Sequence, residues 1–445
     1  MRTAAALLCV GLAAVACGCT APADAPREQP SSPPVQVQAV AYTVFDPDLD
    51  DAEPVETTVH DDYISTTYGS GSSGFALSQQ PDPDLDLCVA LARRRMTGDT
   101  CTVEAGVMVT RMEEFSGVAL VRDGTLLFAS SLLTEGDDGL LDRATSALRS
   151  APTTSLEALG ELTEGEELPE VAVPRVSPDD FRTGTALAAV RHLAGTIGPR
   201  EATGPAFARA ARWVGRRFDR LGFSVQRQRI AVPAGSSWGV PVPAGRSVNV
   251  IATPPGFEPE GPHLVVGAHL DTVPQAPGAE DNASGIGVLL AAAEATAVAR
   301  TRLPVVFVAF GAEEPRSLTD PEQHHFGSRA YVAALTPADR DALRGMISLD
   351  RVGVGARVPV GSASDTDPVQ RQLLAAARRA GVPTTPDTDQ RSSDHWSFVR
   401  EGLPGARLGS TSYVEYHSAQ DRVPVVEPAQ LERVGRVVLG WLAGR

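Results

Sequence analysis

The sequence predicts an α/β protein: a mixed, largely parallel sheet covered by helices on both faces, preceded by a smaller α+β domain. Three observations predict this architecture. Apolar runs of strand length alternate with helical segments through the C-terminal three-fifths of the 445 residues. These runs lack polar alternation, which is typical of strands buried on both faces of a parallel sheet. A separate stretch with a hairpin signal precedes them and has its own patterning.

The N-terminus has the composition of an export signal followed by a tether. Its apolar run over 4–15 is shorter than the roughly 20 residues that span a membrane as a helix. The run ends in Ala-Val-Ala-Cys, which resembles a bacterial lipobox with Cys17 as the lipidated residue. We expect a signal peptide over 1–17 and a tether over 18–34. The protein is then exported and lipid-anchored on the outer face of the bacterial cell membrane, or else secreted.

A small α+β domain of unknown role is expected over 35–151. The predicted strands and helix span 106–112, 117–122, 125–129 and 139–151. The pair Asp123-Gly124 separates two apolar runs, which is the strongest short-range signal for a β-hairpin. An acidic, proline-punctuated linker is expected over 152–180, and a second domain over 181–445.

The cysteines and the charge exclude several classes of site. None of the five cysteines has metal-site spacing, so any metal must be bound by His and carboxylates. Cys88 and Cys101 are expected to form a disulfide in an oxidising compartment. The formal net charge of -16 argues against a nucleic-acid partner, because phosphate binding needs a basic face.

The second domain is predicted to alternate strands and helices. Strands are expected at 264–266, 304–310 and 346–349, and helices at 206–221 and 286–299. Most of its candidate site residues lie at the predicted carboxyl ends of strands, where such sheets bind ligands. These candidates are His269, Asp271, Asp281, Glu313, Glu314, Asp350 and His417.

Two imidazoles and three carboxylates are enough to hold two zinc ions if one carboxylate bridges them. In the adjacent pair Glu313-Glu314, one carboxylate can bind metal while its neighbour holds the proton of an attacking water. Asp271 lies two residues beyond His269, where it can accept the other N–H of that imidazole and fix its tautomer.

The domain over 181–445 resembles the dizinc aminopeptidase family. This family includes secreted bacterial leucyl aminopeptidases, glutamate carboxypeptidase II-type enzymes and glutaminyl cyclases, and it has a zinc exopeptidase fold. The matching stretches, in family order, are GAHLDTV (267–273), PGAEDNASG (277–285), GAEE (311–314), GSRAYV (327–332), ISLDRVG (347–353), SSDHWSF (392–398) and YHSAQD (416–421). The N-terminal region is left unexplained by this resemblance.

The resemblance implies a centre of two Zn²⁺. His269 and Asp350 would bind one ion, Glu314 and His417 would bind the other, and Asp281 would bridge them. The resemblance also implies roles for neighbouring residues. Glu313 would be the general base, which takes a proton from the bridging water and later delivers it to the leaving amine. Tyr416 would hydrogen-bond the oxyanion, and Asp421 would brace the imidazole of His417.

The segment PRSLTDPEQHHF, between Glu314 and Gly327, is longer than the loop usual in this family. It carries His324 and His325, which we expect to lie on a solvated loop rather than to bind metal.

The leading interpretation is an aminopeptidase that acts on peptides outside the cytoplasm. A glutamate-type carboxypeptidase would use the same metals with a basic pocket for the terminal carboxylate. A glutaminyl cyclase is disfavoured, because that branch uses a single zinc and every ligand for two is present. A non-catalytic surface lipoprotein that acts as a binding module is a further alternative, and the intact Glu313 argues against it.

Overall fold

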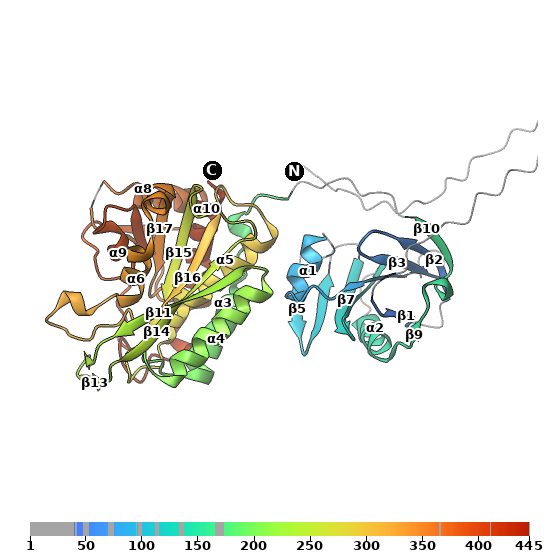
Figure 1. Cartoon of the computed structure of the whole chain (residues 1–445), viewed down its shortest axis with the longest axis horizontal. Helices are drawn as coiled ribbons and strands as arrows, with labels where there is room; N and C mark the ends of the chain where they lie inside the picture. Colours follow the sequence, from blue (N-terminus) through green and yellow to red (C-terminus); the bar gives the residue numbers. More distant parts are fainter. Residues whose placement is uncertain are drawn as a thin grey trace, which may run out of the picture.

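The computed structural model describes residues 40, 42–47, 53–69, 75–94, 96, 100–111, 115–132, 138–164, 173–364, 366–409 and 411–444. The expected signal peptide and tether, including Cys17, lie outside these residues. Figure 1 shows an N-terminal unit and a larger C-terminal domain. Among the described helices, none combines the length and the apolar character needed to cross a membrane.

The N-terminal unit is built on an eight-stranded sheet of order β10-β2-β3-β4-β8-β7-β6-β5, with a small sheet of β1 and β9 beside it. Its strands are β1 (Val44–Phe45), β2 (Pro54–Val59), β3 (Ile64–Tyr68), β4 (Phe75–Pro81), β5 (Thr100–Glu104), β6 (Val107–Arg111), β7 (Phe115–Arg122), β8 (Thr125–Leu132), β9 (Thr153–Thr154) and β10 (Glu161–Glu164). The helices α1 (Leu87–Arg93) and α2 (Asp138–Ser150) belong to two different apolar clusters of this unit. The expected α+β class is confirmed.

The predicted hairpin joins β7 to β8, and both of its turn residues have positive φ, +47° at Asp123 and +79° at Gly124. This is the conformation that a two-residue type I′ turn requires. The expected boundary at 152 differs from the structure, because β9 pairs with β1 and β10 pairs in parallel with β2. The acidic composition of this segment did not indicate a strand. β10 is nevertheless a short edge strand, whose polar side chains can face water. The unit therefore extends to Glu164.

The C-terminal domain contains a mixed eight-stranded sheet of order β11-β14-β16-β15-β17-β20-β18-β19. Its four central strands, β16, β15, β17 and β20, are parallel to one another. The strands are β11 (Ser224–Val232), β14 (Gly245–Thr253), β15 (His263–His269), β16 (Val305–Phe310), β17 (Leu343–Leu349), β18 (Val358–Gly361), β19 (Thr384–Asp387) and β20 (Gly405–Leu408), with a separate hairpin of β12 (Gly235–Ser237) and β13 (Val240–Val242). The prediction of a largely parallel sheet is confirmed.

Helices cover both faces of this sheet, as Figure 1 shows. They are α3 (Thr183–Val190), α4 (Pro205–Arg220), α5 (Gly285–Val298), α6 (Phe326–Ala334), α7 (Pro337–Ala342), α8 (Pro368–Arg379), α9 (His395–Val399) and α10 (Pro428–Ala443). Alternate residues of one strand enter different cores. Val266 of β15 packs in the cluster that contains α3, α4, α5 and α10, whereas Val265 packs with Tyr331 of α6 and Phe398 of α9. Burial on both faces explains the continuous apolar runs in the sequence.

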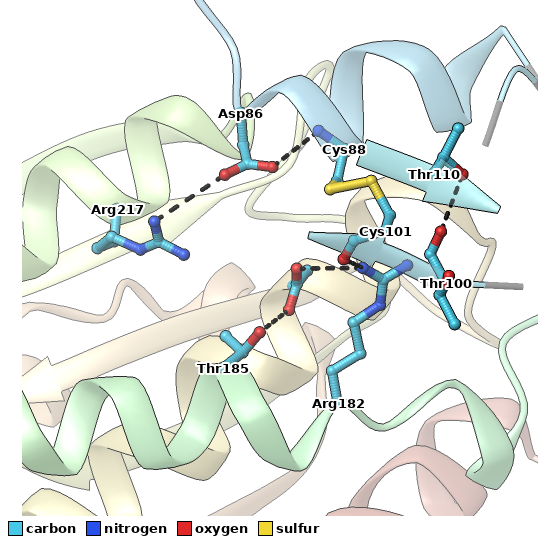
Figure 2. Close-up of a disulfide and its surroundings, with 9 residues drawn as sticks. Asp86, Cys88, Thr100, Cys101, Thr110, Arg182, Thr185 and Arg217 are labelled. Atoms are coloured by element: carbon cyan, nitrogen blue, oxygen red, sulfur yellow. Dashed lines mark hydrogen bonds and ion pairs between the residues drawn. A yellow bond between two sulfur atoms is a disulfide. The ribbon is translucent and has the colours of Figure 1, made fainter. Parts of the chain in front are cut away.

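The expected disulfide between Cys88 and Cys101 is present, and it lies where the N-terminal unit meets the C-terminal domain (Figure 2). Arg182 donates to the carbonyl of Cys101 at 3.3 Å, and the N–H of Asp86 donates to the carbonyl of Arg220 at 2.7 Å. The bridge joins β5, which carries Cys101, to α1, whose N-cap is Asp86.

The contact surface lies at the C-terminal end of α5, where Arg93 donates to the carbonyl of Ala297 at 3.4 Å. The N-terminal end of this helix, at Gly285, follows the segment that carries Asp281. A helix of 14 residues is about 21 Å long. The N-terminal unit therefore contacts the end of α5 that is remote from the candidate site residues.

Replacing both Cys88 and Cys101 with Ser is expected to lower the unfolding free energy of the N-terminal unit by about 3 kcal/mol, because the bridge closes a short loop in the unfolded chain. Urea denaturation followed by circular dichroism measures the change. A reductant should lower the midpoint of the wild type and leave that of the double variant unchanged. An equal response of both proteins to reductant would contradict the expectation.

Candidate active site

The candidate residues converge at the carboxyl ends of the parallel strands. His269 is the last residue of β15, Glu313 and Glu314 follow β16, and Asp350 follows β17. Asp281 and His417 come from loops, one before α5 and one after β20. All six side chains are almost completely buried, with exposed fractions of at most 7%.

Asp281 lies at the centre and contacts one imidazole with each oxygen. Its Oδ1 is 3.1 Å from Nε2 of His269, and its Oδ2 is 3.0 Å from Nε2 of His417. Nε2 of His269 is also 3.7 Å from Oδ1 of Asp350, and Nε2 of His417 is 3.5 Å from Oε1 of Glu314. The donor atoms thus divide into two halves that share Asp281.

These residues fit a metal centre. The ligands of a tetrahedral zinc ion lie about 3.3 Å from one another, as follows from metal–ligand bonds of about 2.0–2.1 Å, and the four separations above bracket that value. Oε1 of Glu314 and Oδ1 of Asp350 are buried and make no hydrogen bond within the described residues. Buried carboxylate oxygens are normally paired, so a cation is the partner that this arrangement lacks.

Two further aspartates hold the backbone of the ligand-bearing segments. The carboxylate of Asp271 accepts the N–H groups of Glu313 at 3.0 Å and Glu314 at 3.1 Å. Its Oδ1 is 4.0 Å from Nδ1 of His269, which instead lies 3.1 Å from the backbone carbonyl of Asp271. The main chain of Asp271, and not its side chain as expected, therefore orients that imidazole.

Asp421 holds the backbone of the segment that carries Asp281 in the same way as Asp271 holds that of Glu313 and Glu314. Its carboxylate accepts the N–H groups of Glu280 at 2.8 Å and Asp281 at 3.1 Å, and the hydroxyl of Tyr413 donates to it at 3.1 Å. Nδ1 of His417 has no hydrogen-bond partner among the described residues. The structure therefore does not show the expected contact between Asp421 and His417, and Asp421 positions the bridging Asp281 instead.

Two fully buried arginines supply positive charge. Arg407 lies 3.1 Å from Oδ2 of Asp350, and Arg200 donates to backbone carbonyls that include those of Leu270 and Gly278. Burial by itself raises the pKa of Asp350, but Arg407 and His269 outweigh it and hold that pKa below its ordinary value. Sequence reasoning missed both arginines, because an isolated Arg after a loop or on a strand has no local signature.

The surroundings of Glu313 contradict one expectation. His324 and His325 do not lie on a solvated loop, because their Nε2 atoms are 3.3 Å and 3.1 Å from Oε1 of Glu313. His325 is only 5% exposed. Burial raises the pKa of Glu313, and the charges of His324 and His269 outweigh it, so that this pKa lies well below its ordinary value. Glu313 is thus held as a carboxylate, the form that can accept a proton.

Two aromatic side chains, Tyr416 and Trp238, contact the imidazole of His417 at one side of the site. The ring of Tyr416 stacks on that of His417 with centroids 3.7 Å apart, and Trp238 meets the same imidazole edge-on at 4.3 Å. Trp238 is 41% exposed and lies in the turn between β12 and β13. Sequence reasoning identified Tyr416 and missed Trp238, whose hairpin carries no catalytic motif.

Residues 249–442 match the family model described as Peptidase family M28. The matched residues lie within the C-terminal domain and support its resemblance to the dizinc aminopeptidase family. Its curated relatives include the aminopeptidase YwaD of Bacillus subtilis, 29% identical over 204 residues, which are 43% of this chain and 43% of that protein. The probable lipoprotein aminopeptidase LpqL of Mycobacterium tuberculosis is 30% identical over 186 residues, 35% of this chain and 33% of that protein. The matches span less than half of the length of these relatives.

Solved structures support the fold. A solved zinc aminopeptidase of Bacillus subtilis superposes with a TM-score of 0.52 at 19% sequence identity, and the match covers 62% of this chain and 95% of that structure. The expected zinc exopeptidase fold is confirmed.

The charges of the site predict how the stability of the metal-free C-terminal domain changes with pH. Burial opposes protonation of His417, but Glu314 and Asp281 outweigh it and raise the pKa of His417 to about 10. A raised imidazole pKa stabilises the fold below pH 6.5, and this contribution is lost as the pH rises through 10. Burial raises the pKa of Glu314 to about 7, which costs stability as its carboxyl ionises between about 4.5 and 7.

Chelator-treated protein should therefore lose stability between pH 6.5 and 10, by up to roughly 1.4 kcal/mol per unit. Thermal unfolding across this interval measures the loss. Zinc should remove much of it, since metal replaces the protons on the imidazoles. A metal-free midpoint that rises with pH would contradict the assignment of charge.

Proposed function

We propose that the chain is an exported zinc-dependent exopeptidase, an aminopeptidase that hydrolyses N-terminal residues from peptides. One observation carries the proposal: Glu313 is a buried carboxylate with a donor atom within 4.8 Å of those of His269 and Asp350, and its Oε1 is 3.1 Å from Nε2 of His325. The match to the Peptidase family M28 model and the aminopeptidase names of the relatives support this activity.

Two Zn²⁺ ions fit the donor set, one held by His269 and Asp350, the other by Glu314 and His417, with Asp281 shared between them. When bound, the metals would polarise the scissile carbonyl and acidify the attacking water.

The chain's own residues carry the proton. Glu313 would accept a proton from water as its oxygen bonds to the peptide carbon, and would donate it to the amine when the C–N bond breaks. Tyr416 would hydrogen-bond the carbonyl oxygen through its hydroxyl, and the stacking of its ring on His417 supports this position. Asp271 would keep Glu313 in place through the backbone hydrogen bond that it accepts.

We further propose that the signal peptide directs export and that Cys17 carries the lipid anchor. The match to a relative named as a probable lipoprotein aminopeptidase supports this location. The partners would be peptide substrates, and nucleic acid would be excluded by the net charge of -16.

A glutamate-type carboxypeptidase is the second candidate, and Arg351 favours it. The guanidinium of Arg351 lies over the ring of Tyr416 at 4.5 Å and 3.7 Å from Oδ1 of Asp350. A cation at this place could bind the terminal carboxylate of a substrate.

Glu313→Gln is expected to lower kcat by about 100- to 10,000-fold, because the amide cannot accept the proton of water. Aminoacyl p-nitroanilides and C-terminally extended peptides serve as the two substrate sets, and metal content is measured on the same sample. The variant should retain the zinc content of the wild type.

Cleavage of the second set alone would favour the carboxypeptidase. If the zinc-loaded wild type cleaves neither set, the peptidase proposal fails. Activity that survives both a chelator and Glu313→Gln would contradict the mechanism.

Asp421→Asn should weaken zinc binding by about 10- to 100-fold, the usual effect of losing a group that orients a ligand. Its amide offers one acceptor oxygen where the carboxylate accepts the N–H groups of Glu280 and Asp281. Competition with a chromophoric chelator measures the affinity. Asp389→Asn, at an exposed acid paired with Arg391, is the control. Equal affinities in the two variants would contradict the role of Asp421.

A further inference from the structure

The inserted segment between Glu314 and Gly327 brings two imidazoles to the expected base. Nε2 of His325 is 3.1 Å and Nε2 of His324 is 3.3 Å from the same atom, Oε1 of Glu313. Neither imidazole belongs to the donor set assigned to the two zinc ions. The three side chains form a second group of donors. It adjoins the first, because a donor atom of Glu313 also lies within 4.8 Å of donor atoms of His269 and Asp350.

Backbone hydrogen bonds fix the position of the inserted segment relative to Glu313. The N–H of His325 donates to the carbonyl of Glu313 at 3.0 Å, and the N–H of Phe326 donates to that of Ala312 at 2.9 Å. Ala312 and His325 both have positive φ, +57° and +56°, a conformation that L-residues seldom adopt. The segment is therefore folded back onto the strand end that carries Glu313, and the imidazoles are placed there by the main chain.

The donor types and separations suit a transition-metal cation. Two imidazoles and a carboxylate are ligands that zinc accepts, and ligand atoms about 3.3 Å apart form the edges of its tetrahedron. Nε2 of His325 is buried but has no hydrogen-bond partner among the described residues, although a carboxylate oxygen is 3.1 Å away. The ring is therefore poorly directed for a hydrogen bond to Glu313, and its nitrogen is left for another partner.

The group is also more accessible than the main donor set. The side chain of His324 is 25% exposed, whereas the side chains of the five proposed zinc ligands are at most 7% exposed. A cation can thus reach Glu313 from the side of His324, and we expect it to exchange faster than ions in the main set.

We propose that Glu313, His324 and His325 form an additional Zn²⁺ site whose occupation inhibits the enzyme. This inference rests on the proposed function, in which Glu313 must accept a proton. A cation on its Oε1 would take the electron pair that the proton needs. The two rings are stacked with centroids 3.7 Å apart at 18°, so both would turn about their Cβ–Cγ bonds to direct their nitrogens to one ion.

Equilibrium dialysis of the full chain against rising free Zn²⁺, with metal analysis, tests the site directly. The wild type should bind a third equivalent more weakly than the first two, and His324→Gln/His325→Gln should stop at two. His324→Gln alone, at the more exposed position, covers the case in which the double variant does not fold. His60→Gln, in the N-terminal unit, is the control and should bind three equivalents.

Activity is measured on the same samples. Filling the third site should lower the rate of the wild type by about 100-fold or more, the usual loss when a general base is removed. The rate of the His324 and His325 variants should not fall in that zinc range. Co²⁺ in place of Zn²⁺ gives a spectroscopic readout, in which the third equivalent adds a visible absorption band that the double variant lacks.

Two outcomes would overturn the proposal: binding that stops at two equivalents in the wild type, or a third equivalent retained by the double variant. In the first case the imidazoles only hold Glu313 in place. Failure of the proposed function has a different signature, because protein with two equivalents would then cleave no peptide while the third equivalent and its absorption band were still present.

Discussion

The structure depends on the burial of several carboxylates at one edge of a parallel sheet. Asp281, Glu314 and Asp350 lie in an apolar domain where an unpaired charge is costly. Imidazoles, the guanidinium of Arg407 and bound cations can compensate that charge, whereas apolar packing cannot. The fold places each carboxylate just beyond a strand or just before a helix, so the backbone that fixes their positions is itself rigid.

Asp271 and Asp421 each hold the backbone of a segment that carries proposed metal ligands. Each carboxylate accepts two consecutive backbone N–H groups, and in each case the second belongs to a proposed ligand, Glu314 or Asp281. These contacts join segments about 40 and 140 residues apart in the chain. The two aspartates therefore act as fixed points for the ligand-bearing segments, which explains how loops can hold donors with the precision of strands.

Much of the fold and of the donor set could be predicted from the sequence, because strands buried on both faces leave continuous apolar runs and because ligands follow strand ends. The function of Asp271 could not, since a carboxylate two residues after His269 can turn to that ring or to a distant main chain. His324 and His325 were misassigned for a related reason. Composition describes how polar a loop is, but it does not reveal that the loop folds back onto Glu313. Local sequence patterns do not indicate which distant segments of the chain contact each other.

The two least predictable segments meet beside the site. The N–H of Ser236 in the β12–β13 hairpin donates to the carbonyl of Arg316 in the inserted loop at 2.9 Å. A side chain at Gly235 would lie 2.2 Å from the same oxygen, so this close approach requires glycine. The hairpin carries Trp238 to His417, and the loop carries His325 to Glu313. These joined segments therefore lie against the metal-binding residues, whereas the contact of the N-terminal unit described above lies at the remote end of α5.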